Sequence, residues 1–240
     1  MEVPSDDGIS YYSQVAADFH ASYDSDPNRI ERMQVWGSFL DRYTAGVSFA
    51  YDIGCGSGML ACELAGRGIE TVGIDGASGM LAIAERTGRM RGLANLSFRQ
   101  ERLPMADVSG LRHAQLIVSS SAIEYLESFP AALAFLHDLL EDSGIAIFSV
   151  SNRHSLSRRL VRTCHRLTGR PRYLRFLRHF MTVNELKSAT RAAGLKYLEH
   201  TYFGGADRLN RALGRLLTPS LANNMIIVAA QKAPAQARAA

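Results

Sequence analysis

The glycine-rich segment Asp52-Ile53-Gly54-Cys55-Gly56-Ser57-Gly58 constrains the fold of this chain more than any other feature. It follows an apolar, strand-like run at 47–50 and precedes a helix-like run at 59–65. Glycines at such a turn let a ligand approach bare backbone, because no Cβ atom stands in the way. The spacing is G-x-G-x-G, unlike the G-x-G-x-x-G of dinucleotide folds or the G-x-x-x-x-G-K-[ST] of phosphate loops. The acidic residue directly before the glycines favours a cationic ligand over a pyrophosphate.

A second carboxylate follows at the end of the next predicted strand. Residues 70–75 form an apolar, strand-like run, and its last residue, Asp75, lies 17 positions beyond Gly58. A carboxylate at this place in a βαβ unit can accept hydrogen bonds from both hydroxyls of a ribose. A turn or helix-capping role is the alternative for a lone Asp. The glycine loop at this spacing favours the ribose.

Together these motifs resemble the class I (Rossmann-like) S-adenosylmethionine-dependent methyltransferases, and in particular the small-molecule group that includes ubiquinone- and menaquinone-type methyltransferases. The segment 52–58 is similar to that family's D-x-G-x-G-x-G loop, and Asp75 is similar to its ribose-binding acid. Residues 103–107 resemble the segment that lines the adenine pocket, and 116–121 read as the fourth strand. Residues 139–148 resemble the family's turn and fifth strand. The similarity extends over about residues 45–152.

The chain departs from the family's pattern on the acceptor side. The family usually has Phe-Asp before the fourth strand, where this chain has Ala114-Gln115, and Ser143 replaces the first glycine of a Gly-Gly turn. The family's Glu-His after the fourth strand is Glu124-Tyr125 here, and the nearest acid before the "LP" segment is in Gln100-Glu101. The resemblance therefore implies a cofactor pocket but does not specify an acceptor.

The resemblance implies S-adenosylmethionine as the cofactor, with S-adenosylhomocysteine as its product. In the family a helical N-terminal lid folds over the cofactor, and Tyr11, Tyr12 and Tyr23 are candidates to close the pocket; packing of the lid is the alternative role. Cys55 is interpreted as a small packing residue of the loop and not as a nucleophile. The residues assigned to the cofactor are Tyr12, Tyr23, Asp52, Gly54, Cys55, Gly56, Gly58, Asp75, Gly76, Met80, Glu101, Arg102, Leu103 and Ser119.

Composition sets the broad class. A chain of 240 residues with 47% hydrophobic and 21% charged residues suits one α/β domain with a sizeable core. It contains no apolar run of about 18 residues that could span a membrane and no signal-peptide pattern. Its three cysteines lack metal-binding spacing and suit a reducing compartment. We therefore predict a cytoplasmic protein without a metal; the oligomeric state is left open.

Short apolar runs alternate with helical segments, which predicts an α/β fold with a doubly wound, seven-stranded, mostly parallel sheet and ligands at its carboxyl edge. Strands are expected near 48–53, 70–74, 96–100, 115–119, 144–150, 195–203 and 225–231, with the last antiparallel by family resemblance. Helices are expected near 11–23, 28–43, 59–67, 77–91, 104–112, 128–141 and 182–193. The single domain 1–240 would comprise a helical lid (1–44), a cofactor-binding core (45–150), a basic helical cover inserted after strand five (151–182), the C-terminal part of the sheet (183–231) and a disordered tail (232–240).

The cover segment is strongly basic. Ser151–Asn184 contains nine arginines and no acidic residue, so its formal charge of +9 leaves −5 for the remaining chain, whose total is +4. Within it, Leu156, Leu160, Cys164 and Leu167 form one apolar stripe at helical spacing, with arginines on the other faces. Three functions fit: a clamp for an acidic acceptor, a helix on an anionic membrane surface, or a nucleic-acid face. The last is disfavoured because no RNA-binding module is recognisable, and a solvated face without function stays open.

Methyl transfer from a sulfonium is an in-line displacement that depends mainly on positioning, and it needs a base only when the acceptor holds a proton. The candidate catalytic residues are Glu124, Tyr125 and His154; helix capping is the alternative for Glu124. The candidate acceptor-binding residues are Arg158, Arg159, Arg162 and His179.

We therefore predict S-adenosylmethionine-dependent methyl transfer to a small, acidic or lipid-like biosynthetic intermediate, at oxygen. The alternatives are N-methylation of a small molecule, an RNA or protein methyltransferase, a nicotinamide-dependent oxidoreductase and a cofactor-binding regulator.

Overall fold

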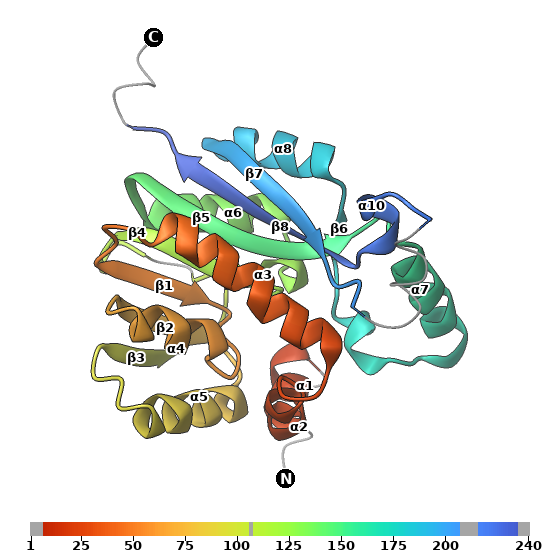
Figure 1. Ribbon diagram of the computed structural model, residues 1–240, viewed down its shortest axis with the longest axis horizontal. Helices are drawn as coiled ribbons and strands as arrows, with labels where there is room; N and C mark the ends of the chain where they lie inside the picture. Colours follow the sequence, from red (N-terminus) through yellow and green to blue (C-terminus); the bar gives the residue numbers. More distant parts are fainter. Residues whose placement is uncertain (1–6, 106–107, 207–215, 235–240) are drawn as a thin grey trace.

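The computed structural model describes residues 7–105, 108–206 and 216–234, and a twisted sheet runs through its centre (Figure 1). The strands follow the order β3-β2-β1-β4-β5-β8-β7, and a short additional strand, β6, pairs with β5. Strands β1 to β6 pair in parallel, whereas β8 is antiparallel to both β5 and β7. The strands are β1 (Phe49–Ile53), β2 (Glu70–Asp75), β3 (Leu96–Gln100), β4 (Ala114–Ser120), β5 (Leu140–Asn152), β6 (Phe180–Met181), β7 (Leu195–Phe203) and β8 (Met225–Lys232). The predicted doubly wound, mostly parallel sheet is confirmed, with β6 as an addition.

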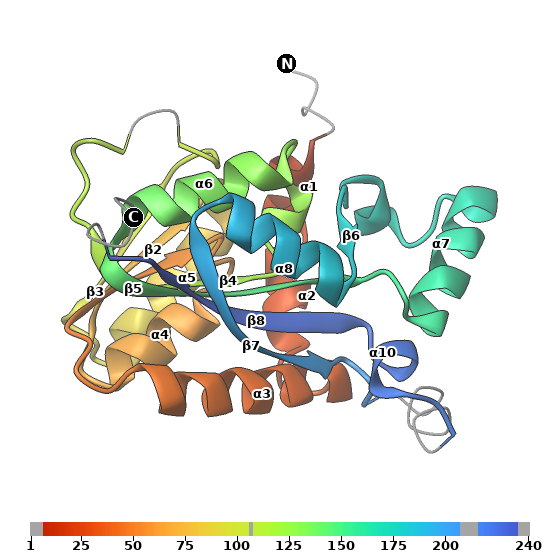
Figure 2. The ribbon, with the colours of Figure 1, turned by 90° about the horizontal axis from the view of Figure 1, so that it is seen from above.

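Helices cover both faces of this sheet, as Figure 2 shows for α3 and α6. Helices α6 (Phe129–Leu139) and α8 (Val183–Ala192) contribute to one apolar cluster, and α3 (Pro27–Tyr43) and α4 (Met59–Gly66) contribute to a second cluster on the other face. All five residues of β1 are buried, because a parallel strand covered on both faces has no solvent side. The sheet therefore provides a rigid platform whose carboxyl edge lies between the two helical layers.

The N-terminal region is helical as predicted, but the expected single helix near 11–23 is two helices, α1 (Gly8–Gln14) and α2 (Ala16–Ala21). The Asp7 side chain caps the Ser10 N–H at 2.9 Å, which starts α1 earlier than predicted. Both helices pack on α5 (Ser78–Met90). A Cβ atom at Gly79 would lie 2.3 Å from the carbonyl oxygen of Ser13, so the glycine allows this close approach.

The predicted helix near 104–112 is wrong for the described residues of that range, which form turns and bends. Pro104 and Gly110 disfavour helix continuation there. Val108 and Leu111 still pack against the core, so the apolar spacing reflects burial of a loop. The prediction for 106–107 and for the tail beyond 234 lies outside the described residues.

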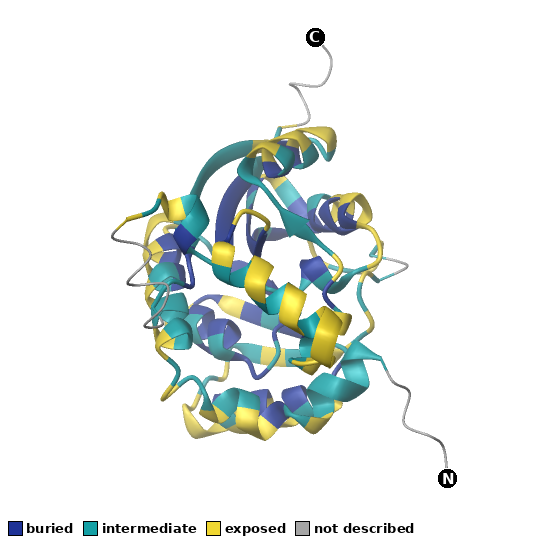
Figure 3. Ribbon diagram, turned by 90° about the vertical axis from the view of Figure 1, so that its right-hand side faces the viewer, coloured by how far each residue is buried: buried dark blue, intermediate teal, exposed yellow. Residues whose placement is uncertain are grey.

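The segment between β5 and β6 contains α7 (Leu156–Thr168) and a 3₁₀ helix at Arg172–Arg175. Figure 2 shows α7 projecting beyond the end of the sheet, near the short helix α10 (Pro219–Ala222). Helix α7 buries none of its residues, and in Figure 3, where it faces the viewer, it carries intermediate and exposed residues. Within the described parts of the chain, no helix has the length and apolar character to cross a bilayer.

Candidate functional site

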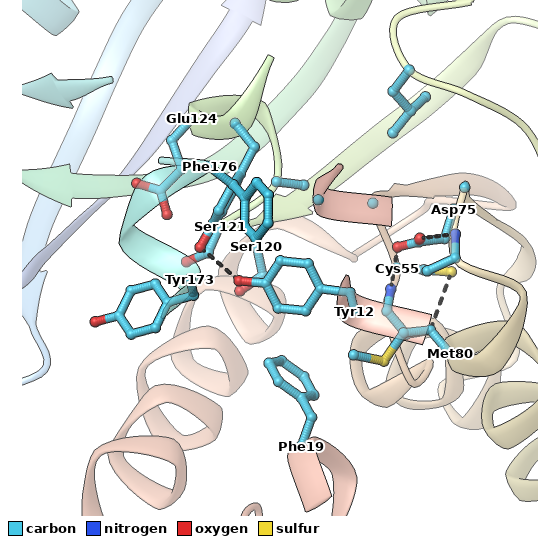
Figure 4. Close-up of a pocket in the computed structure, with 18 of the residues that line it drawn as sticks. Tyr12, Phe19, Cys55, Asp75, Met80, Ser120, Ser121, Glu124, Tyr173 and Phe176 are labelled. Carbon is cyan, nitrogen blue, oxygen red and sulfur yellow. Dashed lines mark hydrogen bonds between the residues drawn. The ribbon is translucent and has the colours of Figure 1, made fainter. Parts of the chain in front are cut away.

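A pocket of about 2100 Å³ lies at the carboxyl edge of the sheet. This volume exceeds the roughly 300–1,000 Å³ of ordinary small-molecule pockets. Figure 4 shows Asp75, Cys55 and Met80 at one end and Glu124, Ser120, Ser121 and Tyr173 at the other, with Tyr12 between them. We call these the acidic end and the acceptor end.

The three glycines of the loop after β1 have different surroundings, although all have positive φ. A Cβ atom on Gly54 would lie 2.1 Å from the Cβ of Ala122, and one on Gly58 would lie 2.7 Å from the Cβ of Ala84. These two glycines therefore allow close packing. Gly56 lines the pocket, and a Cβ atom there would meet nothing within 4 Å. Only Gly56 leaves open space over the backbone for a ligand.

Asp75, at the end of β2, joins this loop to the neighbouring strand. Its two carboxylate oxygens accept hydrogen bonds from the N–H groups of Gly56 and Ala77, each at 2.8 Å. Desolvation raises the pKa of Asp75, and these backbone N–H groups oppose the shift. The carboxylate is therefore fixed beside the open glycine, at the pocket wall.

Asp52 is a second carboxylate at the acidic end, and it is 1% exposed. Burial raises its pKa to about 8, an effect opposed by a hydrogen bond from the backbone N–H of Ala61 and increased by Asp75. Its Oδ2 atom is buried and has no hydrogen-bond partner among the described residues. A buried, unsatisfied carboxylate oxygen is costly, and a cationic ligand would relieve that cost.

Most of the residues predicted for the cofactor line this pocket: Tyr12, Tyr23, Asp52, Gly54, Cys55, Gly56, Asp75, Gly76, Met80, Glu101, Arg102 and Leu103. Two do not. Gly58 caps α4, and the Ser119 hydroxyl donates to the Ile53 carbonyl at 2.8 Å and so links β4 to β1. Burial raises the pKa of the Cys55 thiol well above its usual value, which keeps it protonated.

At the acceptor end, Glu124 is 2% exposed and belongs to a 3₁₀ helix (Ile123–Tyr125) after β4. Its carboxylate accepts a hydrogen bond from the Ser151 backbone N–H of β5, so it links the 3₁₀ helix to β5 and caps no helix of the described residues. Burial raises the pKa of Glu124, and the positive charges of Arg158 and Arg32 oppose the shift. The carboxylate is thus held in a dry site with a raised proton affinity.

A pair of tyrosine hydroxyls lies beside this carboxylate. The hydroxyls of Tyr12 and Tyr125 are 2.8 Å apart. Burial raises the pKa of Tyr12 to about 12 and that of Tyr125 well above its usual value. Both phenols are therefore protonated near neutral pH and can donate hydrogen bonds, but they are poor bases.

Of the other residues predicted on the acceptor side, one lines the pocket and four do not. Arg158 lines the pocket, whereas His154, Arg159, Arg162 and His179 lie outside its lining. His154 and Arg159 are exposed, the Arg162 guanidinium lies 4.1 Å from the centre of the Phe180 ring, and His179 Nε2 is 2.9 Å from the Leu126 carbonyl oxygen. The basic segment therefore contributes one of its three predicted arginines to the pocket.

Several pocket residues were missed by sequence reasoning. Ser120 and Ser121 line it at the carboxyl end of β4, where their position after a predicted strand could have identified them. Arg32 and Phe19 also line it. They lie in predicted lid helices, and no local pattern distinguishes them from other residues of an amphipathic helix. In the described chain, no group of three or more His, Cys, Asp or Glu side chains could hold a metal ion.

Known proteins share the sequence pattern and the fold of this chain. The sequence pattern of the family described as "Methyltransferase domain" matches residues 51–200. A ubiquinone biosynthesis O-methyltransferase of Ruegeria pomeroyi is 29% identical over 154 residues, which cover 63% of this chain and 61% of that protein. The matched region thus spans about three fifths of the length of this curated relative.

Two solved structures share the fold. The magnesium protoporphyrin IX methyltransferase of Synechocystis PCC 6803, with bound SAH, aligns with a TM-score of 0.70 at 15% identity, over 94% of this chain and 98% of that one. The N-methyltransferase NodS of Bradyrhizobium japonicum, in complex with S-adenosylhomocysteine, aligns with a TM-score of 0.65 at 17% identity, over 95% and 99% of the two chains.

Proposed function

Because the chain belongs to the family of methyltransferase domains, we propose that it transfers a methyl group from S-adenosylmethionine to an oxygen atom of a small organic acceptor. The observation that carries the proposal is the acidic end of the pocket. There a buried carboxylate oxygen of Asp52 lacks a partner among the described residues, and Gly56 leaves bare backbone beside Asp75. This arrangement suits a ligand that is both a cation and a nucleoside.

The residues at this end fit the cofactor. Asp75, at the carboxyl end of β2, is positioned for ribose hydroxyls, Asp52 offers negative charge to a cationic group, and Gly56 admits the ligand against the main chain. When bound, S-adenosylmethionine supplies an electrophilic methyl group. The lid residues Tyr12 and Phe19 line the space between the two ends.

Transfer to a hydroxyl requires a proton acceptor, and Glu124 is our candidate. It is the predicted catalytic residue that is buried at the acceptor end and has a raised proton affinity. The acceptor oxygen would form a bond to the methyl carbon, the sulfonium bond would break, and the hydroxyl proton would pass to the Glu124 carboxylate. One hydroxyl of the Tyr12–Tyr125 pair donates to the other, and the hydroxyl whose proton is left over would donate a hydrogen bond that orients the acceptor. Oxygen is preferred because the curated relative is an O-methyltransferase.

We also propose that α7 contacts an anionic membrane surface. Its apolar stripe faces solvent: Leu156, Leu160 and Leu167 are 36%, 57% and 82% exposed. Exposed arginines such as Arg159 and Arg166 flank the stripe. An amphipathic helix with this composition suits the headgroup region of anionic lipid.

Calorimetry and a labelled-cofactor assay test the main proposal together. We expect S-adenosylhomocysteine to bind and NADH not to bind, and we expect Asp75→Ala to weaken S-adenosylhomocysteine binding more than tenfold, because charge-assisted hydrogen bonds contribute about 1.5–3 kcal/mol each. An acceptor screen with labelled S-adenosylmethionine then identifies the product. Binding without turnover of any acceptor would favour a cofactor-sensing regulator, and binding of NADH instead would favour an oxidoreductase.

A further inference from the structure

We propose that the acceptor carries a carboxylate and that Arg32 of α3 and Arg158 of α7 bind this group. The inference rests on the proposed methyl transfer and specifies its acceptor class. Both arginines line the acceptor end of the pocket, although they are 126 positions apart in the sequence. They approach it from the lid and from the basic cover.

Arg32 is held in place by two hydroxyls and by no carboxylate of the described residues. One terminal nitrogen, Nη1, donates to the hydroxyl oxygens of Ser120 and Ser121, at 3.0 Å each. Ser121 has a φ of 55°, a left-handed conformation that is unfavourable for a residue with a side chain. Such strain persists where the surrounding structure imposes it, and it is concentrated at functional sites. Here it accompanies the contact that fixes the Arg32 guanidinium.

Arg158 has hydrogen-bonding capacity left over. Its Nη1 donates to the Tyr173 hydroxyl at 2.8 Å, and its Nη2 contacts the Met225 sulfur, a weak acceptor, at 3.4 Å. Its Nε is buried and has no hydrogen-bond partner within the described residues. A guanidinium fork with an unused Nε–H and a weakly bound Nη2 suits a bidentate carboxylate.

The nearby carboxylate of the protein does not satisfy either arginine. Glu124 is close enough for both positive charges to lower its pKa, yet neither guanidinium forms an ion pair with any described residue within 4.0 Å. One buried carboxylate also cannot neutralise two guanidiniums. An incoming anion would supply the missing charge, and any water that it displaces from the arginines would strengthen that attraction.

The two ends of the pocket then orient the acceptor. Asp52 and Asp75 make one end acidic, which disfavours a carboxylate there, whereas the two arginines attract it to the other end. Tyr12, Phe19 and Phe176 line the space between. A flat, unsaturated acid fits this arrangement, with its carboxylate on the arginines.

Two acids and their amides test whether the acceptor carries a carboxylate. With the protein saturated with S-adenosylhomocysteine, binding of 3,4-dihydroxybenzoate and 4-hydroxycinnamate is compared with binding of their uncharged amides by ligand-observed NMR. We expect each acid to bind about tenfold or more tightly than its amide, as a charge-assisted bidentate contact implies. The ratio should fall towards one in Arg32→Gln and in Arg158→Gln, with an intermediate ratio in Arg32→Lys, which retains the charge and loses the fork.

Arg86→Gln is the matched control, because it removes the same charge from an exposed site on α5, and it should leave the ratio unchanged. Thermal unfolding and S-adenosylhomocysteine affinity show whether each variant is folded. Failure of the natural protein and all variants to bind S-adenosylhomocysteine would count against the methyltransferase proposal itself. Normal S-adenosylhomocysteine binding with no preference for the acids in the natural protein, including no binding of either acid, would overturn the carboxylate proposal alone. A preference that survives in both glutamine variants would overturn it as well.

Discussion

Gly54 and Gly56 lie two residues apart in one loop, yet a methyl group at each would meet different surroundings. We expect Gly54→Ala to lower the free energy of unfolding by several kcal/mol, because its Cβ would overlap the Cβ of Ala122 at 2.1 Å in a left-handed backbone. Gly56→Ala should fold, at a cost of about 1–2 kcal/mol, and lose S-adenosylhomocysteine affinity more than tenfold, because the methyl group would occupy ligand space. Thermal unfolding and calorimetry measure the two effects, and unchanged affinity in folded Gly56→Ala would contradict the assignment.

Asp52 is expected to lower the stability of the ligand-free protein and to strengthen cofactor binding. Its pKa in the folded protein, about 8, lies above its ordinary value of 3.8. The fold therefore favours the protonated acid, and this carboxyl lowers the stability of the ligand-free protein progressively as pH rises from about 4 to 8. Asp52→Asn should raise the Tm of the ligand-free protein, most clearly at pH 8.5, and weaken S-adenosylmethionine binding.

The same carboxyl should make cofactor binding depend on pH. Below pH 8 a cationic ligand must displace the Asp52 proton, so the affinity of the natural protein should increase between pH 6 and pH 8 and level off above it. Asp52→Asn should flatten that profile. Calorimetry at several pH values is the measurement, and parallel profiles for both proteins would show that Asp52 does not titrate with binding.

Sequence reasoning located pocket-lining residues whose positions follow from a motif. Asp52, Gly56 and Asp75 were identifiable because a strand, a glycine turn and a second strand fix their positions. Arg32 was not, because it reaches the pocket through tertiary packing of a helix that is far from the motifs. Arg159 was predicted to face the acceptor with Arg158, but consecutive residues of a helix point in directions about 100° apart, so only one of them lines the pocket.

At the scale of elements, α7 leads to a prediction about lipid surfaces. The natural protein should co-sediment with vesicles that contain phosphatidylglycerol and not with phosphatidylcholine vesicles. The double variant Leu160→Ser, Leu167→Ser should lose this binding, because both leucines face solvent at 57% and 82% exposure. Added salt should weaken binding by screening the arginines. Equal sedimentation of the natural and variant proteins would leave α7 as a solvated helix.

Strands were more predictable than the connections between them. Buried parallel strands are continuous apolar runs, so β1, β2, β4 and β5 could be recognised from composition. The helix near 104–112 was predicted wrongly because the apolar residues of a buried loop can have the spacing that is typical of a helix. The two-residue strand β6 has too few residues to leave a pattern, and it exists because Ser151 and Asn152 of β5 pair with it.

At the scale of the whole molecule, the cofactor should stabilise the fold by linking the lid to the sheet. The pocket is lined by α1, α2 and the loops after β1 and β2, so one ligand would contact all of them. Ligand at 100 times its Kd adds about 2.7 kcal/mol of stability. For a chain of this size we expect S-adenosylhomocysteine to raise the Tm by about 5–10 °C. NADH at the same concentration should leave it unchanged, and a shift with NADH alone would reverse the cofactor assignment.

The basic cover leaves the sheet and returns to it at one place. Arg153 donates its backbone N–H to the Met181 carbonyl at 3.0 Å, and Arg178 and His179 donate theirs to the Glu124 carbonyl at 3.1 and 3.0 Å. These bonds close the base of the excursion independently of what lies within it. Closing a longer or shorter loop on a fixed base changes the entropy of folding only slightly. The segment can therefore change in length or sequence at little cost to the fold, and under our proposal such changes would alter which acceptors bind while the acidic end and its glycine loop stay as they are.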